Sequence, residues 1–172
     1  MTNAEHTRSA PRARGFKTTD LLFLLILVGS IAFILFSRSQ PSAAGVAQSA
    51  TLFAGHSTFE DAAAAAELAG QPVLVFATAD WCGPCQTMKA TTLADPSVQQ
   101  SIQSMAVPYK LDVTSMSDMS ASDGALAQRL GVSGIPASYI VRPDGQVSAK
   151  AVGSMGKDRY VEWVNQSVAA GG

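Results

Sequence analysis

Two cysteines separated by two residues are the part of this 172-residue chain with the clearest chemistry. They stand in the run Trp81-Cys82-Gly83-Pro84-Cys85. A thiolate is the nucleophile of disulfide exchange, and two intervening residues put the second sulfur within bridging reach of the first. We therefore expect Cys82 to attack a disulfide and Cys85 to resolve the mixed disulfide that forms.

The segments on either side of the cysteines predict a strand followed by a helix. Residues 72–79, PVLVFATA, form a continuous β-branched and aromatic run that is typical of a strand buried on both faces. A helical stretch is expected after the cysteines, as far as Ala94. Pro84 suits the first turn of that helix, where no N–H is needed. The exposed N–H groups and the dipole at the start of the helix favour a thiolate at Cys82.

The same cysteine spacing also occurs in half of a zinc site and in a structural disulfide. The chain has only two cysteines, and its two histidines, His6 and His56, are far apart in the sequence. A four-ligand zinc site would have to recruit carboxylates, so we expect no bound metal. Dithiol exchange needs no organic cofactor, so we expect none. The position between a buried strand and a helix favours redox chemistry over a static bridge.

An apolar segment precedes this region. Residues 21–36 carry no charge, and the twenty residues from Thr18 to Ser37 would span about 30 Å as a helix, enough to cross a bilayer. We predict a transmembrane anchor over residues 18–38. The alternative is a cleaved signal peptide, with small residues at 42–44 as the cleavage site.

The lysine and arginine distribution predicts the orientation of this anchor. Four basic residues precede the span and only Arg38 follows it closely. We therefore expect residues 1–17 to be a basic cytoplasmic N-terminus and everything after Arg38 to be exported. Residues 39–50 are small and polar, with Pro41 and Gly45 and no hydrophobic period, which is typical of a linker. The folded domain is expected over residues 51–172.

The expected elements of this domain are β/α units, then a β-hairpin and a final helix. A helix over about 58–69 is predicted by a capping box at Ser57 and Glu60 and by Gly70 at its end. The other expected elements are a helix over 97–104 with Asp95 as its N-cap, a strand over 106–113, a loop over 114–122, a helix over 123–130, strands over 137–142 and 146–152 around the turn at 143–145, and a helix over 157–168. This order indicates an α/β fold.

The composition excludes several classes of protein. Apolar residues make up 47% of the chain and charged residues 15%, which excludes a disordered polyampholyte. The formal net charge is −1, and no basic stripe interleaved with aromatic residues is present. We therefore expect no nucleic-acid partner.

Two motifs resemble the thioredoxin superfamily over roughly residues 51–168. The run from Trp81 to Cys85 is identical to that family's active-site motif, and Gly134-Ile135-Pro136 ahead of a strand is similar to its cis-proline loop. The resemblance implies a thioredoxin fold, with a central mixed β-sheet flanked by helices. It also implies that Pro136 is cis and faces the disulfide, and that Ile135 offers its backbone to an incoming substrate strand.

A closer resemblance is to the exported C-terminal thioredoxin-like domain of membrane thiol:disulfide interchange proteins, and to membrane-anchored periplasmic thioredoxin-like proteins. It rests on the segments 71–73, 79–82 and 93–99, although the usual dipeptide between the cysteines of that group differs from Gly83-Pro84.

One position departs from these relatives, which commonly carry a buried aspartate six residues before the first cysteine to manage the proton of the resolving thiol. This chain has Phe76 there. Asp80 is one candidate substitute, acting through water. Lys89, four residues after Cys85 on the same helical face, is a second, because a cation favours the thiolate. The alternatives are a solvated loop carboxylate and a surface lysine. Without the acid we expect slower turnover.

These features predict a membrane-tethered thiol:disulfide oxidoreductase in the inner membrane, with its domain in the periplasm, that reduces protein disulfides. The implied partners are disulfide-containing proteins, including cytochrome c maturation components by family likeness. A membrane electron donor is also implied, because the Cys82–Cys85 bridge must be re-reduced in an oxidising space. Two alternatives stay open: a disulfide oxidase or isomerase, and a non-catalytic docking module with a static bridge.

Overall fold

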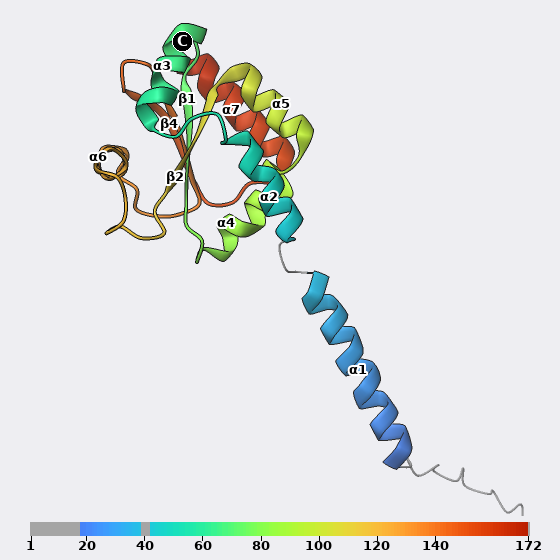
Figure 1. Cartoon of the computed structure of the whole chain (residues 1–172). Helices are drawn as coiled ribbons and strands as arrows, with labels where there is room; N and C mark the ends of the chain where they lie inside the picture. Colours follow the sequence, from blue (N-terminus) through green and yellow to red (C-terminus); the bar gives the residue numbers. More distant parts are fainter. Residues whose placement is uncertain (1–17, 39–41, 172) are drawn as a thin grey trace, which may run out of the picture. The chain divides into compact units, whose positions relative to one another are not determined.

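The computed structural model describes residues 18–38 and 42–171, and the chain divides into two units, residues 1–40 and 41–172. In the first unit the helix α1 runs over Thr18–Arg38 (Figure 1). Its large apolar side chains between residues 22 and 34 are exposed. By length and mean hydropathy, no helix in the described part of the chain qualifies as membrane-spanning. The expectation for residues 1–17 lies outside the described residues.

The second unit is built on a four-stranded mixed sheet with the strand order β2-β1-β3-β4. Its strands are β1 (Val73–Thr78), β2 (Val107–Asp112), β3 (Ala137–Val141) and β4 (Val147–Val152). β1 pairs in parallel with β2 and antiparallel with β3, and β3 and β4 form the predicted hairpin. The expected mixed sheet is therefore confirmed. Pro108 lies in β2, an edge strand, where the missing N–H leaves no central ladder bond unmade.

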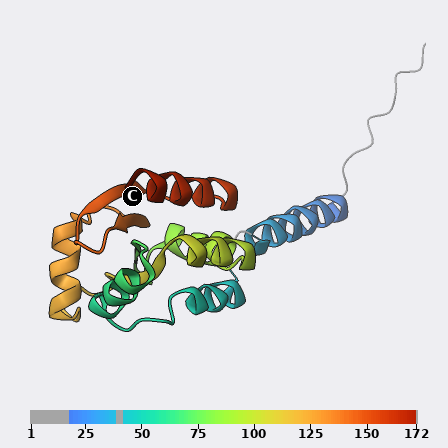
Figure 2. The same cartoon turned by 90° about the horizontal axis from the view of Figure 1, so that it is seen from above.

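The sheet separates two hydrophobic clusters. The helices of this unit are α2 (Ala43–Leu52), α3 (Phe59–Ala69), α4 (Gly83–Met88), the π-helix η1 (Lys89–Leu93), α5 (Pro96–Met105), α6 (Ala121–Leu130) and α7 (Lys157–Gly171). All six residues of β1 are buried. Val73, Val75 and Ala77 join the cluster that includes residues of α3 and α6. Leu74 and Phe76 join the cluster that includes residues of α5 and α7, which lie side by side in both views (Figures 1 and 2).

The ends of the helices follow local sequence signals. Asp95 caps α5 by accepting hydrogen bonds from the amides of Ser97 and Val98, and Gly70 ends α3 at a positive φ of 64°, both as predicted. The predicted N-cap of α3 is wrong by one residue. Thr58, and not Ser57, accepts from the Asp61 amide, at 3.1 Å.

The predicted linker over residues 39–50 is wrong from Ala43 onward, where α2 begins. Ser42 caps this helix by accepting from the Gly45 amide at 3.1 Å, and Leu52 is buried at its end. The side chain of Gln99 in α5 donates to the Gln48 carbonyl at 3.0 Å. Ser49 is buried as well, although the segment has no hydrophobic period. The compact unit therefore starts near residue 41 and not at residue 51.

Phe53, directly after α2, stacks on Phe76 with ring centroids 5.8 Å apart. We predict that Phe53→Ala lowers the free energy of unfolding by about 3 kcal/mol, because it leaves a cavity against the central strand. Urea unfolding followed by tryptophan fluorescence measures this loss. The control is Leu68→Ala, whose side chain is 91% exposed and which should cost less than about 0.5 kcal/mol. Equal losses in the two variants would contradict the packing of Phe53 against Phe76.

Candidate functional site

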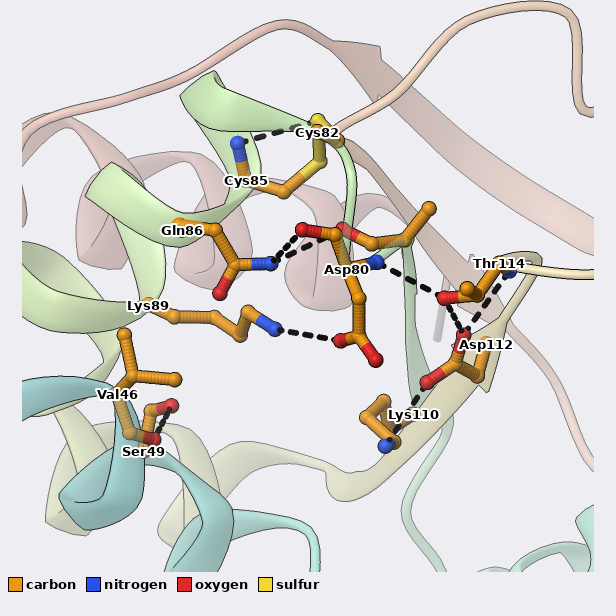
Figure 3. A network of polar contacts seen from close by, with 11 residues as sticks. Val46, Ser49, Asp80, Cys82, Cys85, Gln86, Lys89, Lys110, Asp112 and Thr114 are labelled. Atoms are coloured by element: carbon orange, nitrogen blue, oxygen red, sulfur yellow. Dashed lines mark hydrogen bonds and ion pairs between the residues drawn. A yellow bond between two sulfur atoms is a disulfide. The ribbon is translucent and has the colours of Figure 1, made fainter. Parts of the chain in front are cut away.

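The two cysteines lie at the junction of β1 and α4, where the sequence places them, and they are joined by a disulfide (Figure 3). Their Cα atoms are 5.2 Å apart. Cys82 is the N-cap of α4, and its sulfur accepts a hydrogen bond from the Cys85 amide at 3.2 Å. Cys82 is 5% exposed and Cys85 is fully buried, so Cys82 is the more accessible of the two.

The loop ahead of the cysteines is held by Thr114, just past the end of β2. Its hydroxyl accepts from the Asp80 amide at 2.8 Å, and its carbonyl accepts from the Trp81 indole N–H at 3.0 Å. The Thr114 side chain and amide in turn both donate to the Asp112 carboxylate (Figure 3). The sequence assigned Thr114 only to an exposed loop. Thr114 could have been found only from the parallel pairing of β1 and β2. This pairing brings the carboxyl ends of the two strands together, and Thr114 and the cysteine loop follow those ends.

The cis-proline loop and the cysteine loop are tied together by two adjacent residues. The Ile135–Pro136 bond is cis, as the family resemblance implies. The Gly153 amide donates to the Pro136 carbonyl at 2.8 Å, and the Ser154 hydroxyl donates to the Pro84 carbonyl at 3.2 Å. Sequence reasoning missed both residues. The one local signal for them in the sequence is Gly153, directly after β4, because its φ of 103° is a conformation that favours glycine.

A groove of about 370 Å³ lies against Trp81, the residue before Cys82. Its wall includes Trp81, the exposed aromatic next to Cys82, and Ile135 of the cis-proline loop. Other residues that line it are Val113, Met116, Val132 and Gly134. Because these side chains are mainly apolar, the groove suits an apolar side chain of a bound polypeptide.

Lys89 and Asp80 lie close to each other below the cysteines, with the Nζ and Oδ1 atoms 3.9 Å apart (Figure 3). Lys89 is only 8% exposed, so the alternative of a surface lysine is wrong. Burial lowers the pKa of its ammonium group, and Lys110 lowers it further, whereas the carboxylates of Asp80 and Asp112 oppose this shift. The Asp80 side chain is exposed.

Phe76 stands where the family resemblance implies an acid, and it is fully buried. It pairs in register with Lys110 of β2 and Ser138 of β3. Its ring stacks on Phe53, and both rings belong to the cluster that contains Met88 of α4. An aromatic stack therefore stands where the resemblance implies a carboxylate. Within residues 18–38 and 42–171, no group of three or more His, Cys, Asp or Glu side chains is placed to hold a metal ion.

The mixed sheet, the Cys-X-X-Cys disulfide at the start of a helix and the cis-proline loop together define a thioredoxin-fold protein with a dithiol–disulfide centre. The chain belongs to the thioredoxin-like family, whose model matches residues 54–143. Within this family it is close to the C-terminal domain of the DsbD proteins.

The sequence relatives support this placement. The chain is 34% identical over 97 residues to the thiol:disulfide interchange protein DsbD of Neisseria meningitidis, which is 56% of this chain and 16% of that protein. It is 40% identical over 73 residues to the DsbD protein of Cronobacter sakazakii, covering 42% of this chain and 12% of that protein. The chain therefore spans about one sixth or less of the length of these curated relatives.

Solved structures agree with the sequence matches. The oxidised C-terminal domain of Neisseria meningitidis DsbD is 31% identical, with a TM-score of 0.53 over 63% of this chain and 90% of that one. A thioredoxin from Thermus thermophilus gives a TM-score of 0.57 at 24% identity, over 67% of this chain and 87% of that one. The second similarity concerns the fold alone.

We predict that Phe76→Asp destabilises the protein more at about pH 8 than at about pH 5. Burial of the introduced carboxyl would raise its pKa in the folded state, so the folded protein would bind a proton more tightly than the unfolded chain. Stability is then lost as the pH rises from about 4, the unfolded pKa, through the folded pKa. Urea unfolding at the two pH values measures the difference.

Phe76→Asn is the uncharged control for this prediction, and its cost should not change between the two pH values. A pH-independent cost for Phe76→Asp would contradict the burial of this position. Over the pH range in which the Phe76→Asp variant is folded, the pH dependence of its disulfide reduction also tests whether the missing acid limits proton transfer. An unchanged profile would mean that it does not.

Proposed function

We propose that this protein is a thiol:disulfide oxidoreductase that reduces disulfide bonds in proteins through Cys82 and Cys85. The observation that carries the proposal is the Cys82–Cys85 disulfide at the start of α4. The adjacent residues Gly153 and Ser154 link it to the cis-proline loop, because Gly153 hydrogen-bonds to Pro136 and Ser154 to Pro84. The similarity to the C-terminal domain of a thiol:disulfide interchange protein supports the same chemistry.

The reaction starts from the reduced pair. The Cys82 thiolate attacks one sulfur of the substrate disulfide, forms a mixed disulfide and displaces the other sulfur as a thiolate. The Cys85 thiolate then attacks the Cys82 sulfur, forms the intramolecular bridge and releases the second substrate sulfur. The substrate gains two electrons and two protons as two thiols, and the bridged pair is the oxidised product.

The residues around the pair have complementary roles in this proposal. Trp81, Gly83 and Pro84 shape the loop that presents Cys82. Pro136 has no N–H to obstruct the substrate, and the backbone of Ile135 is the hydrogen-bonding partner for an extended substrate segment. The groove between Trp81 and Ile135 takes a neighbouring apolar side chain.

The proposal assigns pKa control to Lys89 and Asp80, since no acid stands at position 76. The Lys89 ammonium favours the thiolate form of the cysteines, and its low exposure limits screening by water. Asp80 opposes the thiolate unless Lys89 compensates its charge. The ion pair therefore makes the site more reactive than a carboxylate alone would.

We further propose that residues 18–38 tether the domain to the inner membrane, with residues 1–17 in the cytoplasm and the domain in the periplasm. The uncharged run over residues 21–36 and the excess of basic residues before it support this topology. In an oxidising space the bridge must be reduced again. The proposed partner is therefore a membrane dithiol protein that supplies two electrons to Cys82–Cys85.

We predict that Cys85→Ser traps substrates, because it keeps the attacking thiol and removes the resolving one. Mixed disulfides on Cys82 should accumulate in cells and disappear on treatment with dithiothreitol. Non-reducing electrophoresis followed by mass spectrometry identifies the clients. Cys82→Ser is the matched control and should trap nothing. Adducts on Cys82→Ser, or none on Cys85→Ser, would refute the assignment of the two sulfurs.

We predict that the full chain stays in the membrane fraction after a carbonate wash, whereas a chain starting at residue 41 is released. Protease added to spheroplasts should digest the domain, because it lies outside the cytoplasm. Fractionation and immunoblotting measure both results. Release of the full chain, or processing near Ala44, would exclude the anchor, and the latter would establish the signal-peptide alternative.

A further inference from the structure

We infer that helix α2 is a positioning element of the active site. Through Gly45 it packs against η1, covers Lys89, and keeps the ammonium group beside Asp80, where its charge favours the Cys82 thiolate. This inference rests on the proposed thiol chemistry. It adds that a segment outside both active-site motifs adjusts that chemistry.

The contact between α2 and η1 is too close for a side chain at Gly45. A Cβ atom at this position would lie 2.6 Å from the Ala90 carbonyl oxygen and 3.0 Å from the Ala90 Cα atom. Both are backbone atoms and cannot turn away. A glycine at this place is therefore required for α2 to reach the π-helix, and any larger residue forces the two helices apart.

This contact lies directly beside Lys89, the neighbour of Ala90 and the first residue of η1. Figure 3 draws Val46 and Ser49 of α2 on the side of the Lys89 stem. Ser49 is buried, and Lys89 is 8% exposed despite its charge. A lysine stem covered in this way leaves the ammonium group few directions in which to extend.

The covered side chain extends toward Asp80, in the loop before the cysteines (Figure 3). The Lys89 amide donates to the Cys85 carbonyl, so its backbone is one helical turn from the buried sulfur-bearing residue. Its ammonium ends 3.9 Å from the Asp80 carboxylate, two residues before Cys82. Lys89 thus connects the far end of α4 to the loop in front of it.

The charged groups that act on Lys89 are Asp80, Asp112 and Lys110. Residues 43–52, AAGVAQSATL, contain no charge, so α2 contributes burial alone. Removing water from around the ammonium strengthens its field at the active site, because less solvent screens it. If α2 moves away, Lys89 becomes solvated and the exposed charge of Asp80 disfavours the thiolate.

The test is Gly45→Ala in the full-length protein, with the thiolate absorbance of the reduced form at 240 nm recorded against pH. The pKa of Cys82 should rise by about 0.5 unit. The redox potential should become more negative, because the reduced form loses stabilisation. Gly124→Ala is the matched control, a helical glycine of α6 with nothing within 4 Å of the added Cβ, and should change neither quantity.

Two further variants connect the effect to Lys89. Val46→Ala removes part of the cover without forcing the helices apart and should shift the pKa in the same direction. In a Lys89→Met background, Gly45→Ala should have no effect on the pKa, because the charge that α2 positions is gone. An effect of the same size in that background, or an unchanged pKa in both Gly45→Ala and Val46→Ala, would overturn the inference.

These outcomes are separate from a failure of the proposed function. If α2 plays no part, the wild type still reduces a disulfide and its Cys82 still titrates below the ordinary thiol pKa of about 8.5. If the proposed function is wrong, the wild type itself neither reduces disulfides nor shows a lowered thiol pKa.

Discussion

The burial of β1 on both faces is the constraint on which the rest of the folded unit depends. Alternate side chains of Val73–Thr78 enter two separate clusters, so helices must cover both sides of the sheet. Beyond the carboxyl end of this inner strand the chain turns into α4. That turn places Cys82 at the first turn of a helix, with the Cys85 amide directed at its sulfur.

The site is assembled by hydrogen bonds between segments that are distant in the chain. Thr114 holds the loop before the cysteines, and the Ser154 hydroxyl donates to the carbonyl of Pro84, between the two cysteines. The neighbouring Gly153 amide donates to the carbonyl of Pro136 in the cis-proline loop. Residues just after the ends of β2 and β4 therefore bind both loops. Neither motif contains the residues that make this arrangement.

The support below the cysteines differs from that expected from relatives. Phe76 stands where the resemblance implies an aspartate. Its ring stacks on Phe53 and cannot accept a proton. The charge near the site comes instead from Lys89, a cation that is only 8% exposed. The main chemical difference from the site that the resemblance implies is therefore an aromatic ring in place of the acid, with a buried cation nearby.

The sequence by itself determined the elements and the reacting pair. The apolar run of β1, the caps Asp95 and Gly70, and the Cys-X-X-Cys spacing are local signals, so their outcome depends on near neighbours along the chain. Only the tertiary structure decided that residues 43–50 are helical, that Lys89 is buried, and that Thr114 and Ser154 hold the loop. These features depend on close approach between distant segments. At Gly45 such an approach appears in the sequence only as the absence of a side chain, which is also typical of a flexible linker.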